Sequence, residues 1–191
     1  MKKIMMIAAM MVAAVSANAQ VYVGGGIGFQ TTSQGDNTNT VIKIMPEIGY
    51  NLSENWAVGI ALGYGHSKNT VSANGVDVSV KTDVFSINPY ARYTFVKSGN
   101  FSAFVDGGVA YSTIHINGTS DVLGNINQVK VGFNPGVAYA ISPKVGLVAH
   151  LGDLSYESTW CKAKNVDVKV SEGKFNIGLW NSISFGAYYN F

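Results

Sequence analysis

Large apolar residues alternate with small residues between positions 56 and 65 of the chain. The large ones are Trp56, Val58, Ile60, Leu62 and Tyr64, and the positions between them hold only Ala or Gly. Successive side chains point to opposite faces in a β-strand, so this spacing predicts a strand. A strand of a soluble sheet places polar side chains on the face away from the core, whereas here that second face is almost bare. The pattern favours a wall with hydrocarbon outside and a tightly packed interior.

The same alternation, interrupted by clusters of turn residues, predicts eight strands along the chain. They span residues 21–30, 40–51, 56–66, 84–96, 101–112, 130–141, 145–156 and 176–191. The connections alternate in length: short at 52–55, 97–100 and 142–144, long at 31–39, 67–83, 113–129 and 157–175. Strands of about ten residues with short turns at one end and long loops at the other are typical of membrane barrels. We therefore predict an all-β fold, an eight-stranded antiparallel up-and-down transmembrane β-barrel.

Two of the predicted strands contain a proline in their interior. The sequence reads Asn88-Pro89 in one strand and Asn134-Pro135 in another. Proline cannot donate to the ladder of hydrogen bonds, and a closed barrel has no edge strand on which to place it. We therefore expect a β-bulge at each of these two positions.

Two other stretches allow more than one interpretation. Alternation counted back from Phe191 places Trp180 inward and Asn181 outward, so either a bulge resets the phase or this level lies at the outer rim; we favour the rim. Valine alternates with polar residues at 76–81 and 166–170, within the long connections. These segments either offer exposed strand edges to a partner or reinforce the hairpins. We favour reinforcement.

The first residues have the layout of an export signal. Lys2 and Lys3 precede an apolar run from residue 4 to residue 15, and Ala-Asn-Ala at 17–19 provides a cleavage site. We predict a signal peptide over residues 1–19 and a barrel domain over residues 20–191. The apolar run is shorter than the roughly 20 residues that a membrane-spanning helix needs, which argues against a helical membrane protein.

Composition agrees with a barrel in lipid and removes one class of partner. Charged residues make up 13% of the chain, compared with about 25% in ordinary soluble domains. The leader holds two of the 13 basic residues and none of the 11 acidic ones, so the mature chain is neutral. A neutral chain gives no reason to expect nucleic-acid binding. The single cysteine, Cys161, excludes an internal disulfide and leaves a free thiol or an intermolecular bridge open, of which we favour an inert thiol.

Three ionisable residues are predicted to point into the barrel at one level. Glu47, Arg92 and Asp106 each lie about five residues from a short turn. Arg92 and Asp106 are on consecutive strands, so they are the expected pair, because a lone buried charge is costly and a paired one is tolerated. We hypothesise that this cluster plugs the lumen and fixes the strand register, since an eight-stranded interior has room for little more than side chains. The alternative is three charges in separate water pockets.

Aromatic residues gather near the short turns and are expected to form an interfacial girdle, because amphipathic rings prefer the depth of the lipid headgroups. These residues are Tyr50, Trp56, Tyr93, Phe95, Phe101 and Tyr139.

Catalytic and metal-binding patterns are weak. The histidines His66, His115 and His150 are tens of residues apart, and none has metal-ligand spacing with Cys161. His66 precedes a serine at the outer end of a strand, and His150 is expected inside the barrel as a satisfied interior residue. We therefore predict no enzymatic activity, no metal and no cofactor.

The end of the chain resembles the C-terminal assembly signal of bacterial outer-membrane proteins, in which a polar residue, a glycine and two apolar residues mark the last strand. The matching residues are Ser184, Gly186, Tyr189 and Phe191. Over residues 20–191 the chain is similar to the family of small outer-membrane barrels that includes OmpX, OmpA-type barrels and opacity-like "porin family" proteins. That resemblance implies the bacterial outer membrane, contact with its lipid, periplasmic chaperones and the barrel-assembly machinery during biogenesis, and a monomer.

The sequence thus predicts an outer-membrane barrel with a structural or surface-interaction role, a plugged interior and four loops that are free to meet an extracellular partner. The first alternative is a narrow channel for ions or small solutes. A soluble barrel of the lipocalin type is disfavoured, because its bulky apolar face would have to point inward on every strand.

Overall fold

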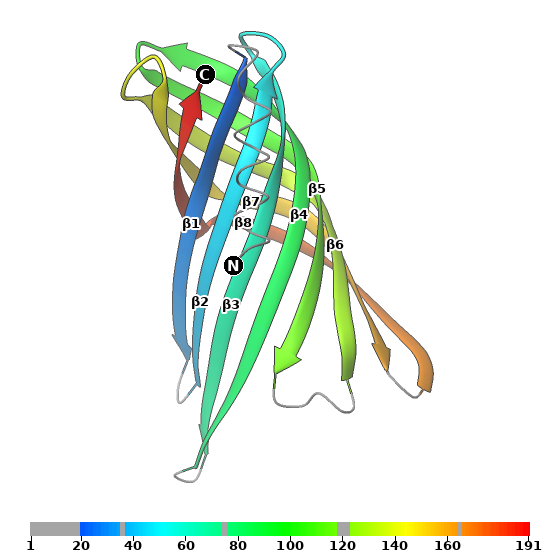
Figure 1. The fold of residues 1–191 in the computed structure, drawn as a ribbon. Helices are drawn as coiled ribbons and strands as arrows, with labels where there is room; N and C mark the ends of the chain where they lie inside the picture. Colours follow the sequence, from blue (N-terminus) through cyan, green and yellow to red (C-terminus); the bar gives the residue numbers. More distant parts are fainter. Residues whose placement is uncertain (1–19, 35–36, 74–75, 118–122, 164–165) are drawn as a thin grey trace.

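The computed structural model describes residues 20–34, 37–73, 76–117, 123–163 and 166–191. These residues form eight antiparallel strands that close into a barrel in chain order, as predicted (Figure 1). The strands are β1 (Val21–Gln34), β2 (Asn37–Asn51), β3 (Trp56–Ala73), β4 (Val76–Ser98), β5 (Phe101–Asn117), β6 (Leu123–Ala140), β7 (Val145–Ala163) and β8 (Val166–Asn190). The predicted signal peptide, residues 1–19, lies outside the described part of the chain.

The barrel has two unlike ends. At one end the short turns join β2 to β3, β4 to β5 and β6 to β7, and the C-terminus lies there too (Figure 1, top). At the other end the strands continue as long hairpins, so the prediction of long loops was wrong for most of their length. Residues 67–73 and 76–82 pair in register, for example, with Ala73 opposite Val76. This pairing with β3 confirms that residues 76–81 reinforce the hairpin, whereas on the other side of β4 the pairing with β5 begins only at Lys81.

The two proline sites behave differently. Opposite Asn134-Pro135 the pairing of β6 with β7 shifts between Phe133 and Gly136, which confirms one bulge. At Asn88-Pro89 the register of β4 is the same on both sides of the proline, so the predicted bulge is absent. Here the pairing of β4 with β5 skips residues 88 and 89, so the N–H group that Pro89 lacks is accommodated without an inserted residue.

The shift in the β4–β5 pairing occurs instead around Phe95. Thr94 pairs with Phe104, and Val96 pairs with Ala103, so one residue is inserted in β4. Both Phe95 and Val96 are exposed on the outer surface. This bulge determines which residue of β5 stands opposite each inward residue of β4 farther along the strand.

The last strand contains the largest irregularity. β7 and β8 are in one register up to His150 opposite Ser184 and in another from Gly152 opposite Leu179, where Gly152 adopts a φ of 136°. Ile177 on one side of this shift and Ile183 on the other are both exposed, so the outward face of β8 keeps the same phase on both sides. The side chains of Trp180 and Asn181 lie outside the described residues. On its other side β8 pairs with β1 from Phe185 to Asn190.

The outer surface is apolar and the interior holds small and polar residues. Val58 is 39% exposed and Leu147 is 49% exposed, although both are aliphatic. By contrast Phe104, Ala138 and Val148 form the buried cluster, with Tyr188 packed against it. The orientation predicted from the alternation is therefore confirmed. No helix among the described residues has the length and apolar character needed to cross a membrane.

Candidate functional site: the polar layer in the barrel lumen

Arg92 on β4 and Asp106 on β5 meet inside the barrel. The two residues are direct cross-strand partners. Arg92 donates from Nε to Asp106 Oδ1 at 2.7 Å and from Nη2 to Oδ2 at 2.8 Å, a two-pronged ion pair. Without the extra residue at Phe95 the register would place Arg92 opposite Gly107 instead. The predicted pair is thus present, and the bulge near the short turn is what brings it into register.

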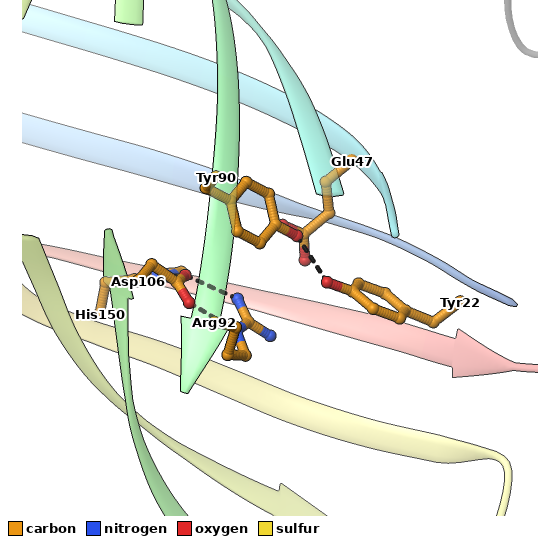
Figure 2. A network of polar contacts seen from close by, with 6 residues as sticks. All are labelled: Tyr22, Glu47, Tyr90, Arg92, Asp106 and His150. Carbon is orange, nitrogen blue, oxygen red and sulfur yellow. Dashed lines mark hydrogen bonds and ion pairs between the residues drawn. The ribbon is translucent and has the colours of Figure 1, made fainter. Parts of the chain in front are cut away.

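His150 on β7 extends this pair across the lumen. Its Nε2 lies 3.0 Å from Asp106 Oδ2 (Figure 2). Phe104 packs edge-on against the His150 ring, with ring centroids 5.5 Å apart, and the Arg92 guanidinium carbon lies 4.1 Å from the centroid of Phe104. Asp106 therefore holds two partners, and one aromatic ring supports both of them.

Glu47 lies in the same layer but binds a partner that the sequence did not reveal. Tyr90 donates to Glu47 Oε2 at 2.8 Å, and the Tyr22 hydroxyl lies 2.8 Å from that of Tyr90 (Figure 2). Because the Tyr90 proton is engaged by Glu47, Tyr22 is the donor of the second bond. The Arg92 guanidinium lies 5.5 Å from the centroid of the Tyr90 ring, which joins the two halves of the network.

The charges of this layer are buried together. Glu47, Arg92 and Asp106 are 7%, 9% and 6% exposed. A charge in such a place is tolerated when it is paired and when its remaining atoms are hydrogen-bonded. We call the six residues drawn in Figure 2 the lumen layer: Tyr22, Glu47, Tyr90, Arg92, Asp106 and His150.

Large inward rings stand directly opposite glycines on the neighbouring strand. The pairs are Tyr22 with Gly49, Tyr90 with Gly59, Phe104 with Gly136 and Tyr188 with Gly146. A Cβ atom at Gly49 would lie 2.1 Å from the ring of Tyr22, and one at Gly136 would lie 2.4 Å from Phe104. These glycines therefore make room for rings rather than for water, and the rings fill the cross-section.

The lumen layer separates two cavities. A cavity of about 510 Å³ lies on the hairpin side and is lined by Glu47, Tyr90, Asp106 and His150 among others. A smaller one of about 180 Å³ lies on the short-turn side and is lined by Tyr22, Arg92, Phe104 and Tyr188. Arg92 faces one cavity and its partner Asp106 faces the other, so the ion pair itself lies between them.

The wall of the larger cavity carries a second, looser group of charges. Lys130 on β6 contacts Asp153, and its Nζ lies 3.8 Å from Glu157 Oε1. Gln128 donates to Glu157 at 3.1 Å, and Ser155 donates to Asp153 at 2.7 Å. The side chain of Lys130 is 31% exposed, so water reaches this group.

The other residues singled out from the sequence lie on the outside. The six girdle residues Tyr50, Trp56, Tyr93, Phe95, Phe101 and Tyr139 are all exposed near the short turns. At the C-terminus, Tyr189 and Phe191 are exposed with ring centroids 4.8 Å apart, Ser184 is half-buried, and Gly186 lies against the backbone of Gly25. The side chain of Cys161 on β7 is outside the described residues.

The histidines do not converge. His150 is in the lumen, whereas His66 lies on the outer face with Nδ1 2.8 Å from Asp83 Oδ1, and His115 is exposed. Among the residues whose positions are described, no three His, Cys, Asp or Glu side chains are grouped as ligands of a metal ion.

Comparison with protein families decides what kind of barrel this is. Residues 4–191 match the family described as the outer membrane protein beta-barrel domain. The chain belongs to this family. Membership of this family places the protein in the bacterial outer membrane, where the apolar outer surface of the barrel contacts hydrocarbon.

Several solved structures share the fold of this outer-membrane barrel. Neisserial surface protein A has 20% identity and a TM-score of 0.53, with 90% of this chain and 97% of that chain covered. OprG from Pseudomonas aeruginosa has 11% identity and a TM-score of 0.55, with 90% and 96% covered. Outer membrane protein W from E. coli has 14% identity and a TM-score of 0.50, with 90% and 97% covered. A comparison with curated protein sequences gives no match.

Proposed function

We propose that this outer-membrane barrel has a closed lumen and a structural or surface-interaction role, with its four hairpins displayed outside the cell. One observation carries the proposal: a continuous set of buried rings and paired charges lies across the lumen between the two cavities. The set includes the ion pair of Arg92 with Asp106 and the hydrogen bonds from Tyr22 through Tyr90 to Glu47. Opening a path for ions requires breaking several of these contacts together.

A narrow channel for ions or small solutes is the second candidate. The cavity of about 510 Å³ favours it, because solute would enter from the hairpin side as far as Asp106. Passage beyond that point requires Arg92 to leave its carboxylate, which is unfavourable at so buried a pair. We rank the closed barrel first for this reason.

The proposal extends to partners and chemistry. We propose that Ser184, Gly186, Tyr189 and Phe191 present the last strand to the barrel-assembly machinery, after periplasmic chaperones have carried the chain. The finished barrel is a non-catalytic monomer without cofactor or metal. It contacts membrane lipid, binds no nucleic acid and meets any extracellular partner through its hairpins.

Conductance in planar lipid bilayers tests the closed lumen. The wild-type protein is expected to show no steady current, whereas the variant Arg92→Ala/Asp106→Ala is expected to conduct because the ion pair between the cavities is gone. Lys144→Ala is the matched control, since Lys144 is a cation in a short turn, outside the lumen layer. A large steady conductance of the wild-type protein would establish the channel and refute the closed barrel.

Capture experiments on intact cells test the surface role. Residues 69–80 can be replaced by a two-residue turn between the cross-strand partners Lys68 and Lys81, which keeps the register of β3 and β4 in the remaining strands. Molecules that the full-length barrel captures are expected not to bind to this shortened form. The same loss is expected for a second form in which the β7–β8 hairpin is trimmed. Equal retention by all forms would contradict a role for these hairpins.

A further inference from the structure

The outer face of β3, β4 and β5 changes from apolar to charged in regular steps toward the hairpins. Tyr64 stands opposite Phe85, two aromatic residues that are both more than half exposed. Two residues farther along β4, on the same face, Asp83 stands opposite His66 on β3 and opposite His115 on β5. Two residues farther still, two lysines stand side by side on the same face.

These lysines are Lys68 on β3 and Lys81 on β4, direct cross-strand partners that are both exposed. Cβ atoms of such partners on one face of a sheet lie about 5 Å apart, and like charges there repel each other. Within the described part of the chain, neither ammonium group has a carboxylate at ion-pair distance. An anion that sits between the two lysines would turn the repulsion into attraction.

Asp83 is already engaged below the lysine pair. Its Oδ1 accepts a hydrogen bond from the Tyr64 hydroxyl at 3.0 Å and lies 2.8 Å from His66 Nδ1. The carboxylate therefore holds the aromatic and imidazole rings in place. Its two cross-strand neighbours, His66 and His115, add further N–H groups near the lysines.

The depth of this face follows from the geometry of tilted strands. The aromatic pair Trp56 and Tyr93, with ring centroids 4.7 Å apart, marks the headgroup level at the short turns. Eight residues farther along β4 is Phe85, a rise of about 20 Å for strands tilted by about 40°. An apolar band of about 25 Å then ends near Asp83, which places Lys68 and Lys81 among the headgroups of the outer leaflet.

We propose that the outward-facing set Lys68, Lys81, His66 and His115 binds the phosphate group of a phosphorylated outer-leaflet lipid. Charge and depth both favour this occupant, because phosphate is the strongly anionic group at the headgroup level. The inference is independent of whether the lumen conducts.

The surface below the cations favours a lipid over a soluble phosphate. Leu62, Ile87 and Tyr111 lie on the same outward face, and Ile87 and Tyr111 are direct cross-strand partners. Ile87 and Tyr111 are exposed. One molecule with a phosphate above and acyl chains below thus contacts the charged and the apolar parts of this wall together, which a free anion cannot do.

Native mass spectrometry of the full-length barrel tests the proposal with lipid A as the probe. The wild-type protein is expected to retain lipid A that carries its phosphates and to bind the dephosphorylated lipid at least about tenfold more weakly. Lys68→Gln/Lys81→Gln is expected to lose the same preference, and Lys68→Arg/Lys81→Arg to keep it. Heat-modifiable gel mobility shows that each variant is folded.

The matched control is Lys97→Gln/Lys144→Gln, which removes two exposed lysines at the short-turn end and so changes the net charge equally. It is expected to bind the phosphorylated lipid as the wild type does. Equal binding of both lipid forms by the wild-type protein would overturn the proposal without any variant. Efficient competition by inorganic phosphate would assign the site to a soluble anion and would equally refute a lipid site.

Discussion

The two halves of the lumen solve the same problem, filling the inside of an eight-stranded barrel, in opposite ways. In the short-turn half, rings and paired charges occupy the cross-section, and the ion pair of Arg92 with Asp106 is almost wholly buried. In the hairpin half, the charges of Lys130, Asp153 and Glu157 line a cavity that water can enter. The same kind of ion pair should therefore have a large energetic effect in one half and a small one in the other.

Glycine has a different role in each half. Gly49 and Gly136 stand under rings, so a methyl group there has no space. Gly28 and Gly65 face the cavity, where a Cβ would meet its nearest neighbour at 3.6 Å and 3.5 Å, an ordinary contact. The number of glycines alone therefore does not show whether the lumen is packed or contains water. The residue directly opposite each glycine on the neighbouring strand does show it.

The largest expected effect is the loss of the buried cation. Arg92→Leu leaves Asp106 with His150 as its remaining partner, and should lower the free energy of unfolding by about 3–5 kcal/mol, since an uncompensated buried carboxylate is costly. Urea unfolding of the protein in phospholipid vesicles measures the change. The variant Arg92→Met/Asp106→Leu serves as control, because removing both charges should restore much of the loss. A cost below 1 kcal/mol for Arg92→Leu would mean that water reaches this layer too.

The next effect contrasts the two kinds of glycine. Gly49→Ala drives a methyl group into the Tyr22 ring, which is fixed by its bond to Tyr90, and should destabilise the barrel by about 1–3 kcal/mol. Gly65→Ala in the hairpin half should leave the stability within about 0.5 kcal/mol of wild type or raise it, because the unfolded chain loses freedom. The urea midpoints of unfolding of both variants measure these effects. Equal losses of stability would contradict the proposed difference between the two halves of the lumen.

Much of this fold follows from the sequence, because alternation, turn clusters and parity are local properties. They predicted eight strands, the outward position of Val58 and Leu147, and the pairing of Arg92 with Asp106. The hairpin lengths were underestimated because polar alternation outside the membrane resembles loop sequence. The β-propensity of the residues does not distinguish a strand from a loop in this part of the chain.

The rest depends on register, which no local pattern fixes. The bulge at Phe95 and the one in β8 set which residues face each other across strands. The registers of the other pairs matter as well: Tyr90 reaches Glu47 through the pairing of β2 with β3 and of β3 with β4, and Gly49 lies under Tyr22 through the pairing of β1 with β2. A signal was nonetheless present: inward aromatic residues on one strand matched inward glycines at the mirrored distance from a turn on the next.

A third prediction transfers the ring-over-glycine pair into the hairpin half. Gly63 on β3 stands directly opposite Ser86 on β4, both facing the lumen. Ser86→Phe would place a ring over Gly63 and fill part of the cavity, so it should raise stability by about 1 kcal/mol. Adding Gly63→Ala to this variant should abolish the gain. Destabilisation by Ser86→Phe alone would show that the cavity cannot accept a ring and that the two halves differ in shape as well as in sequence.

The smallest effect is expected at the partly buried ion pairs of the cavity wall, where Lys130 is 31% exposed. Lys130→Met removes the cation beside Asp153 and Glu157, yet should cost only about 0.5–1 kcal/mol, because these carboxylates are reached by water and are screened. The cost should shrink further as salt is added, whereas that of Arg92→Leu should not. Unfolding free energies at low and high ionic strength test both statements. A salt-independent cost of several kcal/mol at Lys130 would show that the hairpin half is as dry as the short-turn half, and the distinction between the two would be lost.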